Sequence, residues 1–136
     1  MVATTPTKRA SCYPRGTSVF SVTALPARQE LSTSTVNIIE SRKDLAFGVT
    51  VTNRGCAQET KIPVTLTIPA SPTPIVRRAE IDQINPGEEE TVVLRDIGAV
   101  PCADRTSIRV DVEPVPGEAT TKNNSVEYPA IFALGP

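Results

Sequence analysis

The chain has 136 residues, enough for one domain with a buried core of its own. Its 14 Lys and Arg residues nearly balance its 15 Asp and Glu residues, so no strongly basic surface for nucleic acid is expected. It contains no His, which excludes Ser-His and Cys-His nucleophile pairs and His-bearing zinc sites. It also contains no Trp, which disfavours an aromatic platform for carbohydrate.

Residues 1–16 are polar and are expected to form an N-terminal arm. They lack the apolar core of a signal peptide, and no apolar run in the chain approaches the ~20 residues that a membrane span needs. The polar start fits a tail, or a position just after an upstream membrane anchor.

Short runs with apolar residues at alternate positions follow, at intervals of roughly a dozen residues. Residues 79–84 predict only a short, irregular strand. Pro63 and Pro129 lack a backbone N–H, which predicts an exposed edge at both positions, or a bulge at Pro63. The other predicted strands are 17–25, 35–40, 45–52, 62–68, 91–97, 107–112 and 126–132. With no helical period anywhere, the pattern predicts an all-β fold. We expect one antiparallel two-sheet sandwich of about seven to nine strands with Greek-key connections, over residues 17–134.

Three motifs carry a resemblance to a known family. They are Phe47–Gly55 (FGVTVTNRG), Ile84–Glu88 (INPGE), and Glu113–Glu118 followed by Asn123–Ser125. In this order they resemble motifs of the CARDB domains, cell-adhesion-related domains of bacterial and archaeal envelope proteins, over about residues 36–134. Similar domains often occur in actinobacterial proteins behind a single membrane anchor. The resemblance implies an immunoglobulin-like sandwich outside the cytoplasm, and it implies no catalysis.

The turn that follows the strand at 45–52 and the loop before the last strand are expected to meet at one end of the sandwich. Asn and Gly tolerate tight turns, and Asn side chains bond to nearby backbone groups. We therefore expect a structural loop motif made of Asn53, Gly55, Glu118, Asn123 and Asn124. In this motif Glu118 would accept backbone N–H bonds from the loop after Asn53.

A calcium site at this loop end would need roughly six to eight oxygen ligands, several of them from carboxylates. The sequence places Glu118 there, with Glu127 and Glu59 as further acids. These are too few, so no metal site and no cofactor are predicted.

The three cysteines, Cys12, Cys56 and Cys102, lie too far apart in sequence for a zinc knuckle or a CxxC redox site. One disulfide with one spare thiol would suit an oxidising compartment, whereas three buried thiols would suit the cytosol. A simple seven-strand order puts Cys56 and Cys102 at opposite ends of the sandwich, which conflicts with a bridge between them. The favoured pair is Cys12 with Cys102, which would staple the arm to the sandwich. A Cys12–Cys56 bridge and no bridge are the alternatives.

These features predict a non-enzymatic, extracytoplasmic module that acts as a spacer or a protein-interaction domain of a cell-envelope protein. Its partner would be an unknown protein of the envelope. The alternative is an accessory module of a larger secreted protein that binds a small ligand or a glycan, which exposed aromatic residues would favour. An enzyme would have to rely on carboxylates such as Glu118 and Glu127 alone, and no constellation of catalytic groups supports that role.

Overall fold

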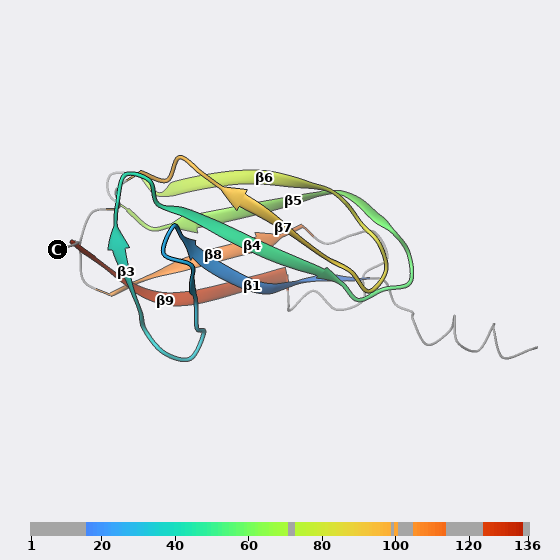
Figure 1. The fold of residues 1–136 in the computed structure, drawn as a ribbon, viewed down its shortest axis with the longest axis horizontal. Coiled ribbons are helices and arrows are strands. Elements are labelled where there is room, and N and C mark those ends of the chain that lie inside the picture. Colours follow the sequence, from blue (N-terminus) through green and yellow to red (C-terminus); the bar gives the residue numbers. More distant parts are fainter. Residues whose placement is uncertain (1–15, 71–72, 99, 101–104, 114–123, 135–136) are drawn as a thin grey trace, which may run out of the picture.

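The computed structural model describes residues 16–70, 73–98, 100, 105–113 and 124–134. These residues form two facing β-sheets and contain no α-helix, so none of the described segments is a helix that could cross a membrane (Figure 1). The strands are β1 (Thr17–Leu25), β2 (Gln29–Glu30), β3 (Asn37–Ser41), β4 (Ala46–Asn53), β5 (Glu59–Ile68), β6 (Ile75–Ile84), β7 (Glu89–Leu94), β8 (Thr106–Val112) and β9 (Ser125–Leu134). One sheet has the order β2-β1-β4-β7, and the other has the order β3-β9-β8-β5-β6.

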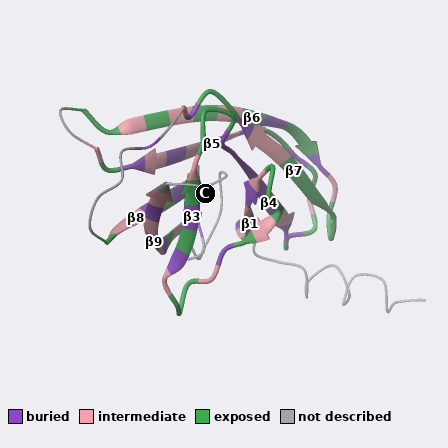
Figure 2. Cartoon of the chain, turned by 60° about the vertical axis from the view of Figure 1, so that its left-hand side comes forward, coloured by how far each residue is buried: buried purple, intermediate pink, exposed green. Residues whose placement is uncertain are grey.

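The core lies between the two sheets because alternate residues of each strand turn inward. In β5, every second residue from Ile62 to Ile68 is almost completely buried, while the threonines between them are half-buried. In β4, Phe47, Val49 and Val51 are fully buried in the same way. Figure 2 shows buried and half-buried positions alternating along β5. Burial of these apolar faces is the main force that holds the sheets together.

The described structure confirms an immunoglobulin-like β-sandwich with nine strands in two sheets. All strand pairs are antiparallel except β3 with β9, which run parallel from Asn37 beside Ala130 to Ser41 beside Leu134. The chain before β4 therefore contributes β1 to one sheet and β3 to the other. This crossing between sheets is absent from the sequence-based expectation.

The positions of two prolines correct the expectation of exposed sheet edges. Pro63 lies in β5, an interior strand between β8 and β6. The register of β5 with β6 is the same on both sides of Pro63, so this pairing contains no bulge there. The pairing of β5 with β8 starts only at Val64, so the ring of Pro63 lies just outside that ladder. Pro129 lies in β9, also an interior strand, between β8 and β3. The pairing of β9 with β3 starts only at Ala130, so the ring of Pro129 displaces no hydrogen bond of that ladder.

Strand β6 also differs from the expectation. The sequence predicted a short, irregular strand over 79–84, whereas β6 has ten residues, Ile75–Ile84, and forms one border of the five-stranded sheet. Its first six residues alternate between half-buried and exposed, and the half-buried positions include Arg77 as well as Ile75 and Ala79. The hydrophobic pattern was therefore too weak to reveal its first half.

Candidate functional site

The end of the sandwich where β4 finishes and β9 begins, here called the Asn53 end, carries the residues that the sequence singled out. Thr17 of β1 pairs with Asn53 of β4, and Arg54 N donates to Gly16 O at 2.9 Å. The Asn124 side chain, just before β9, donates to Thr17 O at 3.0 Å. Thr17 therefore lies between Asn53 and Asn124 and links the two sheets at this end.

Asn53 is fully buried and its side-chain amide makes three hydrogen bonds. Its Nδ2 donates to Ala57 O at 2.8 Å and to Ile84 O at 3.0 Å. Its Oδ1 accepts from Gly55 N at 2.9 Å. The amide thus closes the turn after β4 and fixes it to the end of β6, which belongs to the other sheet.

The backbone of Asn53 holds the turn between β6 and β7. Gly87 N donates to Asn53 O at 2.9 Å, and Asn53 N donates to Glu88 O at 3.0 Å. Gly87 has a φ of 78°, which glycine adopts without the strain that a side chain would add. The sequence identified both Asn53 and this Pro-Gly-Glu turn, but it gave no sign that the two are hydrogen-bonded.

Of the five residues in the expected loop motif, the structure brings together Asn53, Gly55 and Asn124. Glu118 and Asn123 lie outside the described residues, so the expected bonds from Glu118 stay a prediction. Two buried oxygens at this end, Thr17 Oγ1 and Asn124 Oδ1, have no hydrogen-bond partner within the described part of the chain.

The cysteines require a correction. Cys56 is disulfide-bonded, and both other cysteines of the chain lie outside the described residues. The chain has three cysteines, so a bridge from Cys56 to one of the other two leaves the third unpaired. Cys12 and Cys102 then cannot be bridged to each other. The favoured pairing of Cys12 with Cys102 is therefore wrong. The bridge joins the turn at the Asn53 end to another part of the chain.

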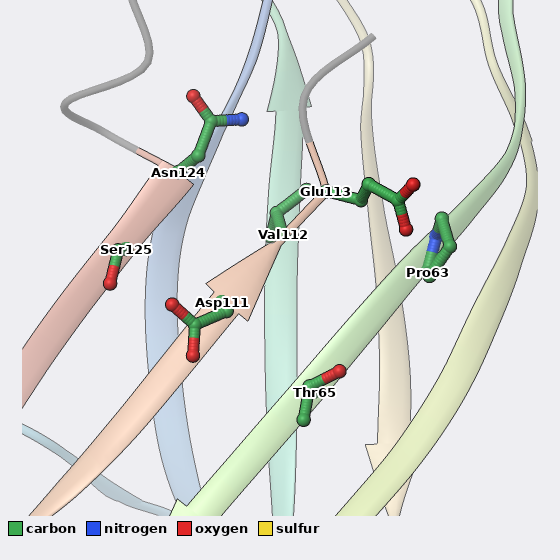
Figure 3. A pocket seen from close by; sticks show the side chains of 7 residues that line it. All are labelled: Pro63, Thr65, Asp111, Val112, Glu113, Asn124 and Ser125. Atoms are coloured by element: carbon green, nitrogen blue, oxygen red, sulfur yellow. The ribbon is translucent and has the colours of Figure 1, made fainter.

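A pocket of about 360 Å³ opens beside Asn124 on the five-stranded sheet (Figure 3). Two carboxylates, Asp111 and Glu113, line it, but Figure 3 shows that they point in opposite directions, toward Ser125 and toward Pro63 respectively. Arg109 Nε lies 3.1 Å from both oxygens of Asp111. This arrangement does not place two carboxylates on either side of a substrate bond, as glycoside hydrolysis needs.

The other acids that the sequence considered as metal ligands lie apart. Glu59 is buried at the start of β5, whereas Glu127 is exposed on β9, with its Oε2 3.9 Å from Arg109 Nη1. Among the residues that the structure describes, no three His, Cys, Asp or Glu side chains are grouped closely enough to hold a metal ion.

A second hollow, of about 470 Å³, lies on the flank of the sandwich between β1 and β9 and includes Phe20, Glu30 and Tyr128. Phe20 is the extra residue of a bulge in β1 and is 62% exposed. Tyr128 is almost completely buried. Its burial, and secondarily the Glu30 carboxylate, raise the pKa of Tyr128 above its ordinary value of 10.0, so its hydroxyl stays protonated at neutral pH. The sequence did not reveal this hollow because the two strands are distant along the chain.

Comparison with known proteins identifies the fold of the chain. No protein-family model matches the sequence, and no curated protein matches it. Among solved structures, a CARDB domain from Pyrococcus furiosus, crystallised in complex with di-metal ions, superposes with a TM-score of 0.59. The match covers 89% of this chain and 96% of that domain, at 15% sequence identity. The chain has the CARDB fold.

Two further structures agree with this fold. A solution structure of the same Pyrococcus CARDB domain gives a TM-score of 0.58 at 16% identity, and covers 88% of this chain and 97% of that one. A Niemann-Pick type C2 protein from the Japanese carpenter ant gives 0.52 at 10% identity, and covers 88% of this chain and 94% of that one. At these identities the similarity establishes the architecture of the sandwich, and the expected resemblance to CARDB domains is confirmed at the level of structure.

Proposed function

We propose that this chain is a non-enzymatic, extracytoplasmic CARDB-like module that acts as a spacer or protein-interaction domain in a cell-envelope protein. The observation that carries the spacer role is the path of the chain through the sandwich. It enters β1 at Thr17, at the Asn53 end, and it leaves β9 at Leu134, beside Ser41 at the opposite end. Figure 1 shows these two points at opposite ends of the long axis. Modules with this path can be joined end to end.

The construction of the Asn53 end supports a rigid spacer. Turns from the β4–β5 and β6–β7 connections are held there by bonds to one buried asparagine, Asn53. Buried hydrogen bonds of this kind fix one geometry, because an alternative arrangement would leave polar groups unsatisfied. A rigid joint between neighbouring modules needs a single fixed geometry of this kind.

The disulfide at Cys56 supports the extracytoplasmic location. Disulfides persist in oxidising compartments and are rare in the cytosol of most cells. The fold points the same way, because the CARDB motifs that the sequence resembles are typical of envelope proteins.

Small-angle scattering of two copies joined in tandem tests the spacer role. A ten-residue strand spans about 33 Å, so the maximum dimension should grow by at least about 30 Å relative to one copy. A tandem protein with a long Gly/Ser linker between the copies serves as the control for a flexible joint. A maximum dimension that hardly grows, because the two copies lie side by side, would contradict the spacer role.

One observation favours a second candidate, an accessory module that binds a small ligand or glycan. Phe20 presents an exposed ring beside the hollow that contains Tyr128 and Glu30. Stacking on an aromatic ring and hydrogen bonds to a protonated phenol and a carboxylate suit a sugar. In a glycan screen followed by calorimetry, this candidate predicts that Phe20→Ala lowers affinity at least about tenfold. Ile38→Ala is the matched control, since Ile38 is 57% exposed but lies outside this hollow. Equal affinity of the two variants would remove this candidate.

A further inference from the structure

Strand β6 is the longest border strand of the sandwich. One sheet is bordered by β2 and β7 and the other by β3 and β6, and these strands have two, six, five and ten residues. Among the described segments, only β5 pairs with β6, so its other side offers free backbone groups. A long unpaired border strand is the feature through which sheets associate unless something blocks it.

The register of β5 shows which residues of β6 face this open side. Pro63 O accepts from Glu113 N at 3.1 Å, so the backbone groups of Pro63 point toward β8. Those of the next residue, Val64, then point toward β6, where its partner is Ala79. Because the direction alternates along a strand, the residues of β6 whose backbone faces outward are Val76, Arg78, Glu80 and Asp82. Arg77 Nη1 donates to Val76 O at 2.8 Å, which agrees with an outward-facing carbonyl at that position.

The side chains at these outward positions are exposed and carry charges of both signs. Val76 is 42% exposed, and Arg78, Glu80 and Asp82 are also exposed on the outer face of the sheet. None of these three charged side chains forms an ion pair with another described residue. By contrast, the next longest border strand, β7, has only six residues, Glu89–Leu94.

We propose that the outer edge of β6 pairs antiparallel with the same edge of a second copy of this chain, with Ala79 on the twofold axis. In this register each Arg78 lies opposite the Glu80 of the other copy, so that two cross-strand pairs of opposite charge form. Such pairs stabilise adjacent strands, and like charges directly opposite destabilise them. The pairing would join the two five-stranded sheets into one continuous sheet.

The charges select this register against its neighbours. Residues whose backbone faces outward must pair with each other across the two copies. The twofold axis can therefore lie on a residue of β6 but not midway between two residues. A shift to an axis at Arg78 places two arginines opposite each other, and a shift to an axis at Glu80 places two glutamates opposite each other. With the axis at Ala79, the residue on the axis is small, which suits the close approach of about 4.5 Å between Cα atoms in a pair without hydrogen bonds.

Charge exchange tests the proposal, with mass measured by sedimentation equilibrium across a concentration series. The wild-type chain should dimerise below about 1 mM. Arg78→Glu or Glu80→Arg alone places like charges opposite each other twice, and each should raise the dissociation constant at least about tenfold. An equimolar mixture of these two variants restores both opposite-charge pairs, so it should form a heterodimer. The double variant R78E/E80R should dimerise like the wild type.

Lys43→Glu is the matched control, because Lys43 is exposed, lies between β3 and β4, and undergoes the same change of charge as Arg78. It should leave dimerisation unchanged. A wild-type chain that is monomeric up to about 1 mM overturns the proposal. It is equally overturned by single variants that dimerise like the wild type, or by a mixture that stays monomeric. The proposal does not rest on the spacer role. The tandem scattering experiment is run in the R78E background, so that failure of either proposal is recognised separately.

Discussion

Loss of the disulfide at Cys56 is expected to lower the free energy of unfolding by about 4 kcal/mol. A disulfide stabilises a fold mainly because it restricts the unfolded chain, and the gain grows with the length of the loop that it closes. Both candidate partners, Cys12 and Cys102, lie about 45 residues from Cys56, so the chain-entropy relation gives nearly the same value for either bridge. Urea unfolding of Cys56→Ser against the wild type measures the loss.

Serine variants of the two candidate partners then identify the bridge. One of Cys12→Ser and Cys102→Ser should match Cys56→Ser in stability, while the other should stay within about 0.5 kcal/mol of the wild type. Alkylation of the chain purified from its source cells should label one thiol before reduction and three after it. Three labelled thiols before reduction, together with no loss of stability in any of the serine variants, would show that the bridge does not form. The extracytoplasmic location would then lose its main chemical support.

The sequence predicted those strands in which apolar residues occupy the buried, inward-facing positions. In β4 and β5 the inward positions are apolar and nearly inaccessible, so a period of two was visible without any structure. In β6 the inward positions include Arg77, which is half-buried and donates from Nε to Asp96 O at 2.9 Å. A border strand can place a long polar side chain on its inner face in this way, because the end of that side chain reaches past the core. The pattern of apolar residues therefore understated the length of β6.

The sequence located the residues of the site better than it located their partners. Asn53 was found from local turn chemistry, and its bond to Gly55 N is local. Its bond to Ile84 O depends on how two sheets meet, which no short pattern records. Another buried asparagine, Asn37, escaped notice for the same reason. Its Nδ2 donates to Ser32 O and to Pro129 O, both at 2.8 Å, where β3 joins β9. The cysteine pairing failed because it relied on a simple strand order and on an arm whose position the sequence does not fix.

Replacement of Asn53 by Ala is expected to lower the free energy of unfolding by about 3 kcal/mol. The side chain makes three hydrogen bonds of 2.8 to 3.0 Å and is fully buried. Each such bond contributes roughly 1 kcal/mol, and Ile84 O would be left buried without this donor. Because the same amide fixes the β4–β5 turn to the end of β6, the turn should also become more accessible. Hydrogen exchange at Gly55 N and Gly87 N should speed up by more than the global loss of stability explains.

Two further variants separate the hydrogen bonds of Asn53 from its volume. Asn53→Asp keeps the shape and the acceptor for Gly55 N, but it faces Ala57 O and Ile84 O with an oxygen instead of an amide. Its loss of stability at pH 7 should equal or exceed that of Asn53→Ala, because a buried carboxylate beside two carbonyls is strongly unfavourable. The loss should shrink in acid, where the protonated carboxyl can donate to one of them. Asn85→Ala is the matched control, since the Asn85 side chain accepts only an exposed bond of 2.7 Å from Gln58 and its loss should cost less than about 0.5 kcal/mol. If Asn53→Ala and Asn85→Ala are equally stable, the buried amide does not hold this end of the sandwich together, and the rigid joint on which the spacer role depends lies elsewhere in the molecule.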